Sequence, residues 1–227
     1  MNTAIIVAAG SGSRFSSETP KQFIELSGKP VVIRTIERFE SCDEITAIVL
    51  VLPAEQIDAF HNLAAGHEFV KLTAVVAGGD SRAQSVVKGL EKVDRETKIV
   101  AVHDGARPLV TIEDITRVVH RADETGAACL VAHVTDTIKE IDGDQIAGTL
   151  ERRNLRRALT PQAFHLEILL DAYENADAAE VATDDSSLVE EQGYEVTAVV
   201  GSPCNIKITH PEDLIIAEAL LRDEEGK

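Results

Sequence analysis

The chain of 227 residues is long enough to bury an ordinary hydrophobic core in one large domain, or in one domain with an excursion. Its 44% hydrophobic residues are interrupted by charges, no apolar run approaches the roughly 20 residues that span a bilayer, and no basic leader is present, so we expect a cytoplasmic protein. The 39 Asp and Glu residues outnumber the 22 Lys and Arg residues and give a formal charge of -17, which argues against nucleic acid or an anionic membrane as a partner.

The first predicted element is a strand over residues 3–9, whose apolar run TAIIVAA is typical of a central parallel strand buried on both faces. The loop that follows contains Gly10, Gly12, Arg14 and Lys21. It leaves the carboxyl end of the strand, where ligands bind in open α/β sheets, and glycines let backbone N–H groups approach an anion. The loop therefore favours a phosphate site, and a Gly-Ser turn with two solvated cations is the alternative.

Two familiar phosphate-binding motifs do not fit this loop. A dinucleotide fingerprint needs a third glycine after Gly10 and Gly12, at the position that Phe15 holds. The Gly-Lys-Ser/Thr of a Walker A loop is absent as well. The rest of the chain must therefore decide what the loop binds.

Apolar strands and amphipathic helices alternate along the rest of the chain. The further expected strands lie at residues 45–52, 72–76, 99–102, 127–134 and 196–200. The expected helices lie at residues 30–40, 55–64, 81–93, 112–124 and 166–175. Gly126 is expected to end the fourth helix, Pro211 to begin a last helix, and the residues from Arg222 onward to form a frayed tail. The alternation predicts an α/β fold with a doubly wound, mostly parallel sheet.

One segment breaks this alternation. Residues 137–150, TIKEIDGDQIAGTL, contain two short alternating runs around Asp142, Gly143 and Asp144, and Asp-Gly is a strong hairpin signal. A lone hairpin of such polar composition is marginal in water, so we interpret it as an arm that packs against another chain. A solvent-exposed hairpin that lies on its own domain is the alternative.

A second polar cluster, AGGDSRAQS at residues 77–85, lies between an expected strand and an expected helix. It presents backbone and short polar groups at the carboxyl edge of the sheet. A carboxylate or hydroxyl there can accept a hydrogen bond from an exocyclic amine, the donor that marks cytosine at N4. Capping of the helix by Asp80 or Ser81 is the alternative, and both roles can hold together.

A third cluster, VHDGARP at residues 102–108, follows a buried strand directly. Its carboxylate, Asp104, can hold a magnesium-bound water or accept from a substrate hydroxyl, while the Arg107 guanidinium neighbours a phosphate. His103 is not expected to act as a general base, because a single histidine beside a strand is more often packed or hydrogen-bonded.

A fourth cluster is expected to be a short strand over residues 205–209, NIKIT. Its alternation places Ile206 and Ile208 on one face of the strand and Lys207 alone on the other, so that the strand directs the Lys207 ammonium. The alternative is that Lys207 is an ordinary surface lysine. Convergence of four such clusters on one sheet edge favours a binding site over four separate structural explanations.

The cysteines Cys42, Cys129 and Cys204 lie far apart in the sequence, without CxxC spacing or clustered histidines. Neither a zinc site nor a disulfide framework is predicted, and reduced thiols are expected. No residue is assigned as a ligand of a protein-held metal.

Six segments carry a resemblance to a known family. AAGSGSRF…PKQF, GGDSRAQSV, HDGARP, TDTIKE, ALTPQAF and NIKITHPEDL resemble, in order and spacing, the 2-C-methyl-D-erythritol 4-phosphate cytidylyltransferases of the non-mevalonate isoprenoid pathway. The resemblance runs over nearly the whole chain. It implies a single nucleotidyltransferase domain over residues 1–227, with a Rossmann-like sheet and a protruding β-arm at about residues 135–158 that exchanges contacts in a homodimer.

The resemblance also implies roles for individual residues. Those implied at the nucleotide CTP are Ala8, Ala9, Gly10, Gly12, Gly79, Asp80 and Ser85. The cations implied at the reacting phosphates are Arg14, Lys21 and Lys207. Those implied at the erythritol phosphate are Asp104, Arg107 and Thr160, with Thr137 and Arg152 reaching over from a partner's arm. Magnesium is implied as the cofactor, bound mainly through the phosphates of CTP.

The sequence departs from the family pattern in small ways. Phe15 stands where a methionine is common, and Gly105 where many members carry alanine, and neither change removes a charged group. Arg152 and Arg153 are adjacent, so either could face the substrate.

The implied reaction is attack by a phosphate oxygen of methylerythritol phosphate on the α-phosphorus of CTP, with release of pyrophosphate. Because the second pKa of a phosphate monoester is about 6, the nucleophile is already mostly anionic at neutral pH and no general base is required. Positioning and electrostatics would then supply most of the catalysis. The alternatives are a ribitol 5-phosphate cytidylyltransferase and a catalytically silent nucleotide-binding regulator of the same fold.

Overall fold

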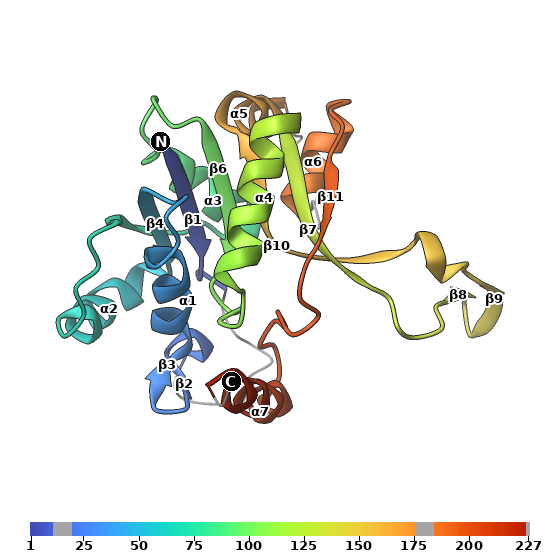
Figure 1. The fold of residues 1–227 in the computed structure, drawn as a ribbon, viewed down its shortest axis with the longest axis horizontal. Coiled ribbons are helices and arrows are strands. Elements are labelled where there is room, and N and C mark those ends of the chain that lie inside the picture. Colours follow the sequence, from blue (N-terminus) through green and yellow to red (C-terminus); the bar gives the residue numbers. More distant parts are fainter. Residues whose placement is uncertain (11–19, 176–183, 226–227) are drawn as a thin grey trace.

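The computed structural model describes residues 1–10, 20–175 and 184–225, and a seven-stranded sheet runs through the centre of this part of the chain (Figure 1). In order across the sheet, the strands are β11 (Thr197–Val200), β7 (Ala127–His133), β10 (Arg156–His165), β6 (Ile99–Asp104), β1 (Asn2–Val7), β4 (Ala47–Leu52) and β5 (Leu72–Ala77). Strand β10 runs antiparallel to β6 and β7, and the other neighbouring pairs are parallel. The predicted mostly parallel sheet is confirmed.

Strand β1 occupies the interior of the sheet because its side chains are apolar on both faces. Ala4 and Ile6 belong to the hydrophobic core on one face and Ile5 to the core on the other, and all three are fully buried. Val7 at the end of β1 is in register with Asp104 at the end of β6. The loops that leave these two parallel strands therefore start at the same edge of the sheet.

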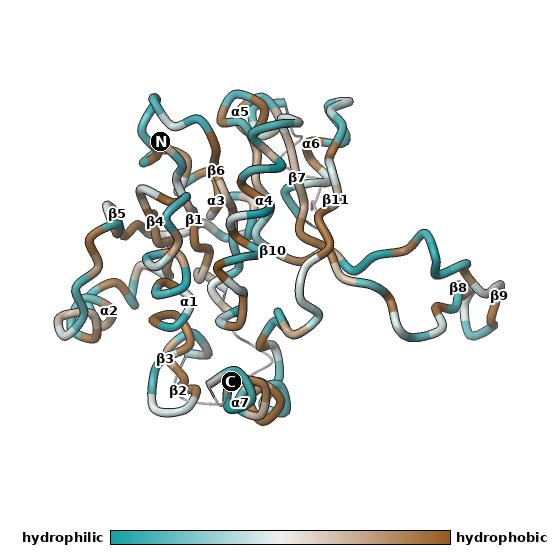
Figure 2. Tube along the Cα trace, viewed as in Figure 1, coloured by the Kyte–Doolittle hydropathy of each residue, from teal (hydrophilic) through white to brown (hydrophobic). Residues whose placement is uncertain are grey.

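Helices cover both faces of this sheet. The helices α1 (Val31–Glu40), α2 (Ile57–Ala64) and α4 (Ile112–Thr125) pack on one face, and α3 (Arg82–Leu90), α5 (Leu166–Asn175) and α6 (Asp185–Glu191) pack on the other. Figure 1 shows α1 and α4 in front of the strands, and Figure 2 shows that the strands between the helices are mostly hydrophobic. The result is a three-layer α/β/α arrangement, as the alternation predicts.

Helix α4 begins and ends where the local sequence dictates. The Thr111 hydroxyl accepts a hydrogen bond from the Asp114 N–H at 3.0 Å and so caps the first turn. Gly126 adopts a φ of 89°, which favours glycine, and its N–H donates to the Ala122 carbonyl at 2.8 Å. The predicted helix end at Gly126 is confirmed.

Strand β10 and helix α6 were not among the expected elements. The alternation pattern of β10 is hidden by two arginines at its start and by Pro161, since proline within a run argues against a strand. In the structure the pairing of β10 with β7 shifts register between Ala158 and Gln162, and Pro161 lies inside this irregularity. The ladder therefore continues on both sides of the proline.

Two expectations near the C-terminus are wrong. Residues 205–209 form no strand, because they lie outside the sheet. Isolated hydrogen bonds hold them in place, such as the one from the Ile208 N–H to the Ala106 carbonyl at 2.8 Å. The expected alternation survives, since Ile208 is fully buried while the Lys207 side chain is 40% exposed. Residues 222–225 of the expected frayed tail are instead part of α7 (Pro211–Glu225), where Glu224 pairs with Arg38 at 2.6 Å, and residues 226–227 lie outside the described residues.

Short elements complete the described chain. They are the 3-10 helices η1 (Lys21–Phe23), η2 (Ala54–Gln56) and η3 (Arg152–Asn154), the small hairpin of β2 (Glu25–Leu26) with β3 (Lys29–Pro30), and the hairpin of β8 (Lys139–Asp142) with β9 (Gln145–Thr149).

The β8–β9 hairpin stands apart from the main sheet. Its strands pair only with each other, and Gly143 takes a φ of 56° in the turn between them. Figure 1 shows the hairpin projecting well beyond β7 and β10, and almost all of its residues are exposed. The predicted hairpin is confirmed, and its contact with another chain stays a prediction.

Candidate active site

A pocket of about 440 Å³ opens where β1, β5 and β6 end. This is the edge of an open α/β sheet at which ligands bind. Eight of the predicted site residues line it: Ala8, Ala9, Gly10, Gly79, Asp80, Ser85, Asp104 and Lys207. Segments separated by up to about two hundred residues of sequence therefore meet at one pocket, as the convergence of the four clusters predicts.

Part of the glycine loop lies outside the described residues. Gly12 and Arg14 belong to residues 11–19, and the side chain of Lys21 is likewise outside the description, although its backbone begins η1. Their roles stay predictions.

The first turn of α3 forms one wall of the pocket. The Ser81 hydroxyl accepts from the Gln84 N–H at 3.1 Å, which confirms the predicted cap, and the Ser85 hydroxyl accepts from the Gly79 N–H at 3.2 Å. A side chain at Gly78 would lie 2.7 Å from the Ser85 Oγ, so glycine lets the loop approach the helix. The positive end of the helix dipole thereby faces the pocket and favours an anion.

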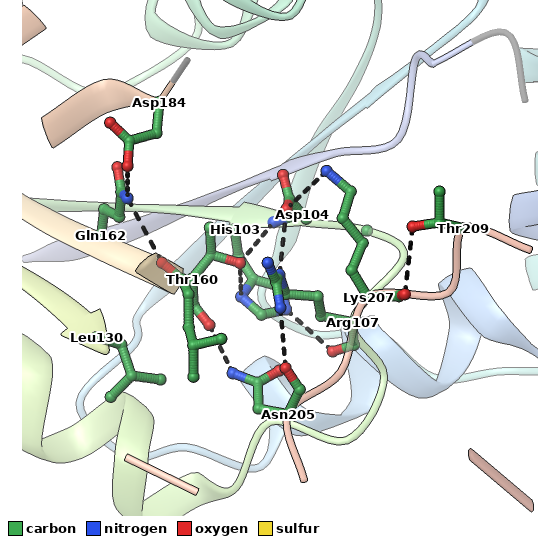
Figure 3. A network of polar contacts seen from close by, with 12 residues as sticks. His103, Asp104, Arg107, Leu130, Thr160, Gln162, Asp184, Asn205, Lys207 and Thr209 are labelled. Atoms are coloured by element: carbon green, nitrogen blue, oxygen red, sulfur yellow. Dashed lines mark hydrogen bonds and ion pairs between the residues drawn. The ribbon is translucent and has the colours of Figure 1, made fainter. Parts of the chain in front are cut away.

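Asp104 is the electrostatic centre of the site (Figure 3). Its Oδ1 lies 3.3 Å from Arg82 Nε, and its Oδ2 lies 3.2 Å from Arg107 Nε and 3.0 Å from Lys207 Nζ. Burial acts to raise the pKa of Asp104, but the charges of Lys207, Arg82 and Arg107 outweigh it and hold the pKa far below its usual range. The carboxylate is therefore ionised at every working pH, and it keeps three cations together.

Gln22 and Arg82 are among the five lining residues that were not predicted as site residues. Arg82 Nη2 donates to Asp185 Oδ2 at 2.7 Å while its Nε faces Asp104. Burial acts to lower the pKa of Arg82, but the neighbouring charges of Asp185 and Asp104 outweigh it and the pKa is raised. No local pattern could have found this pairing, since Asp185 lies 103 residues further along the chain.

Arg107 connects two segments of the site. Its side chain is 12% exposed, and its Nη1 donates to the Asn205 carbonyl at 2.9 Å while its Nε faces Asp104. The guanidinium thus fixes the segment that carries Lys207 against the end of β6 (Figure 3). A contact of Arg107 with a substrate phosphate stays a prediction.

Thr160 lies beneath the pocket in a chain of hydrogen bonds. Its hydroxyl accepts from the Asp104 N–H at 3.1 Å and lies 3.0 Å from His103 Nδ1, while His103 Nε2 lies 3.1 Å from the Arg107 carbonyl. Because that carbonyl only accepts, Nε2 carries the imidazole proton and Nδ1 accepts from the Thr160 hydroxyl. The hydroxyl is therefore engaged within the protein, which favours a positioning role for this buried residue over contact with substrate.

His103 is fully buried, and burial lowers its pKa to about 3. The unfolded chain takes up a proton below about pH 6.5 and the folded chain does not, so the free energy of unfolding should decrease as the pH falls, by up to about 1.4 kcal/mol per pH unit. We expect His103→Gln to flatten this slope between about pH 6.5 and pH 4 in urea unfolding experiments. The exposed His120, paired with Glu44, provides the control, and a wild-type slope in His103→Gln would contradict the assignment.

Two further predicted residues lie away from the pocket within this chain. Thr137 precedes β8 and Arg152 begins η3, so both belong to the projecting segment in Figure 1. A guanidinium nitrogen of Arg152 donates to the Thr135 carbonyl. The structure brings neither residue to the pocket of its own chain.

The comparisons with known proteins agree over nearly the full length. The family model for 2-C-methyl-D-erythritol 4-phosphate cytidylyltransferase matches residues 2–223. A protein of that name from Syntrophus aciditrophicus is 42% identical over 227 residues, which cover 99% of this chain and 97% of the relative. Another, from Bacillus licheniformis, is 43% identical over 226 residues with the same coverage.

Solved structures show the same similarity. The 4-diphosphocytidyl-2C-methyl-D-erythritol synthase of Anaerococcus prevotii superposes with a TM-score of 0.85 at 31% identity, over 97% of this chain and 98% of that one. The 2-C-methyl-D-erythritol 4-phosphate cytidylyltransferase of Thermus thermophilus gives a TM-score of 0.78 at 33% identity, over 98% and 100% of the two chains. With a pocket at the expected sheet edge and matches along almost every residue, the chain belongs to the family of 2-C-methyl-D-erythritol 4-phosphate cytidylyltransferases.

Proposed function

We infer that the chain transfers the cytidylyl group of CTP to 2-C-methyl-D-erythritol 4-phosphate and releases pyrophosphate, with 4-diphosphocytidyl-2-C-methyl-D-erythritol as the other product. The observation that carries this inference is the family match over residues 2–223. The pocket supports it, because six of the seven residues that the resemblance assigns to CTP line one cavity with Asp104 and Lys207, and the seventh, Gly12, lies outside the described residues. A cationic cluster within a chain of charge -17 suits a ligand that carries phosphates.

The proposed mechanism is an in-line attack without a general base. The phosphate of the acceptor is already anionic, so the protein needs to bring two anions together and stabilise the charge that spreads onto the leaving pyrophosphate. Lys207 and the N-terminus of α3 supply positive potential within the pocket. Asp104 orients Lys207 and offers an acceptor for a substrate hydroxyl, while Arg14 and Lys21 are proposed to act on the phosphates from the glycine loop.

Magnesium is proposed to reach the site on the triphosphate of CTP. Among the residues that the structure describes, no three His, Cys, Asp or Glu side chains gather into a metal site. The described lining does include the carboxylates of Asp80 and Asp104, and Mg²⁺ at nucleotide sites takes one or two carboxylates together with phosphates and waters. This donor set fits the ion, with Asp80 or Asp104 holding one of its waters, and the bound ion would neutralise phosphate charge.

The polyol phosphate is tested by measuring pyrophosphate release from CTP and Mg²⁺ with either 2-C-methyl-D-erythritol 4-phosphate or ribitol 5-phosphate. We expect release with the first compound. Release with ribitol 5-phosphate alone would show the related cytidylyltransferase instead. Binding of CTP without release with either compound would favour a silent nucleotide-binding regulator.

We propose further that the chain works as a homodimer through the β8–β9 hairpin. The hairpin exposes the apolar side chains of Ile141, Ile146 and Leu150, and a two-stranded hairpin is marginal unless something packs against it. A second copy that covers this surface would carry Thr137 and Arg152 towards the partner's pocket. The active site would then be composite.

Arg152→Ala should raise the KM for the erythritol phosphate about tenfold and leave the KM for CTP nearly unchanged, because a charge-assisted hydrogen bond to the acceptor's phosphate is lost. Steady-state kinetics with each substrate varied in turn measures both constants. Arg153→Ala is the matched control, since Arg153 is exposed and paired with Glu151 at 3.4 Å. A larger increase of the KM for the erythritol phosphate in Arg153→Ala than in Arg152→Ala would exchange the roles of the two arginines. Equal increases of the KM values for both substrates in Arg152→Ala would indicate a structural role.

Mixed dimers test the composite site directly. In a dimer of one Lys207→Ala subunit and one Arg152→Ala subunit, one site would carry both changes and the other would carry neither. Mixing the two variants should therefore restore activity above that of either alone. A mixture as inactive as its components would argue against exchange of the hairpin.

The site of action is proposed to be the cytoplasm. Cys42, Cys129 and Cys204 are free thiols, and Cys204 is exposed, which suits a reducing compartment. In the described part of the chain, no helix is both long and apolar enough to cross a membrane.

A further inference from the structure

Asp185 is a buried carboxylate that the proposed mechanism does not use. It lies in the first turn of α6 and is fully buried. Its Oδ2 accepts from Arg82 Nη2 at 2.7 Å and its Oδ1 accepts from the Tyr173 hydroxyl at 2.5 Å. A buried charge is costly unless it is paired and hydrogen-bonded, so these two contacts account for its presence.

The arginine that pairs with Asp185 also contacts the pocket, through a second nitrogen. Arg82 is 26% exposed, lines the pocket at the start of α3, and directs Nε to Asp104 Oδ1 at 3.3 Å. The guanidinium is planar and rigid, so a carboxylate that binds Nη2 restricts the direction in which Nε points. Asp185 therefore determines the direction from which Arg82 meets Asp104.

The same contacts continue to the lysine that the transfer reaction requires. Asp104 uses Oδ1 for Arg82 and Oδ2 for Lys207. A carboxylate that turns to follow a displaced Arg82 carries its second oxygen with it and changes the place of the Lys207 ammonium. A line of contacts thus runs from Asp185 through Arg82 and Asp104 to Lys207.

A purely structural role for Asp185 would leave part of this arrangement without a reason. An ion pair that only fastens α6 to α3 would not need the Nε of Arg82 to meet a second carboxylate at the pocket. The chain offers a comparison in Asp171 of α5, which accepts from the Tyr194 hydroxyl at 3.0 Å but pairs with no arginine in the described part of the chain. Both carboxylates bind a tyrosine, and Asp185 alone of the two leads to the pocket.

We propose that Asp185 is a positioning residue for cytidylyl transfer: it holds Arg82 against Asp104 and thereby sets the place of Lys207. The proposal rests on the proposed function of the pocket. Tyr173 supports Asp185, and the Tyr173 hydroxyl stays protonated because burial, followed by the charge of Asp185, raises its pKa.

The first measurement is the effect of Asp185→Asn, which keeps the shape of the side chain and removes its charge. We expect kcat/KM to fall at least about tenfold, because a charged hydrogen bond in a buried site is lost. Asp171→Asn is the matched control and should remain within about twofold of wild type. Assays are run below the melting temperature of each variant, and activities are referred to folded protein.

The second measurement separates positioning from folding. Arg82→Ala leaves a gap between two carboxylates, which free guanidinium ion at low millimolar concentration can occupy. Guanidinium should raise the activity of Arg82→Ala several-fold, and it should not raise that of the double variant Arg82→Ala, Asp185→Asn. Asp185→Asn should also cost little more once Arg82 is absent, since nothing remains for it to hold.

Three results would overturn the proposal. They are an Asp185→Asn variant within about twofold of wild type, independent and multiplying effects of the Asp185 and Arg82 changes, and equal rescue by guanidinium with and without Asp185. The wild type is assayed for turnover of CTP in the same experiment. If the wild type turns CTP over, these results count against the role of Asp185 alone. If it does not, the proposed function fails, and the proposal for Asp185 fails with it.

Discussion

Lys207→Ala should lower kcat for cytidylyl transfer by about two orders of magnitude or more, the usual cost of removing one donor that stabilises transition-state charge. The Lys207 ammonium lies on the pocket wall, 3.0 Å from Asp104, and its side chain is 40% exposed. A triphosphate in the pocket can therefore compete with Asp104 for it. Because charge on the phosphates increases as pyrophosphate leaves, the loss should appear in kcat more than in the KM for CTP.

Two variants make this result specific. Lys88→Ala removes a lysine of α3 that is paired with Glu91 at 2.8 Å on the surface, and it should leave kcat within about twofold of wild type. Lys207→Arg keeps the charge but changes its shape and reach, so partial activity is expected. Turnover of Lys207→Ala within a few-fold of wild type would contradict the assigned role.

The sequence contains enough information to predict six of the seven strands of the central sheet, all except β10. A strand that is buried on both faces needs an unbroken apolar run. The apolar runs at residues 3–9 and 99–102 indicate where the chain reaches the sheet edge, and in the structure β1 ends at Val7 and β6 at Asp104. Because parallel strands end at a common edge, the polar residues that follow each run could be assigned to one pocket from their positions alone. Ala8, Gly79 and Lys207 meet there in the structure.

Other parts depend on contacts that no local pattern contains. The pairing of Arg82 with Asp185 spans 103 residues, and β10 pairs antiparallel with β6 and β7 in spite of Pro161. The segment that carries Lys207 has the alternation of a strand but lacks a neighbouring strand, so its hydrogen bonds go to Ala106 and to Arg107. In each case the tertiary partner decides what the local sequence leaves open.

Asp104→Asn should lower kcat/KM for the erythritol phosphate by about a hundredfold and also lower the melting temperature. The change leaves Arg82, Arg107 and Lys207 facing one another without the carboxylate that holds them. Breaking a buried ion pair on one side costs about 3–5 kcal/mol, and the partial exposure of Lys207 and Arg82 places this variant at the lower end of that range. Thermal unfolding and steady-state kinetics measure the two effects.

Pyrophosphate distinguishes the electrostatic cause from simple damage to the fold. With Asp104 neutral, an anion can replace the missing charge among the three cations, so pyrophosphate should raise the melting temperature of Asp104→Asn more than that of wild type. Asp114→Asn is the control, because Asp114 is a buried carboxylate of α4 that accepts from the Ser202 N–H at 2.8 Å and lies outside the pocket lining. Asp114→Asn should have a lower melting temperature than wild type, and pyrophosphate should not raise it more than it raises that of wild type. Equal stabilisation of both variants by pyrophosphate would mean that Asp104 does not govern the charge of the pocket.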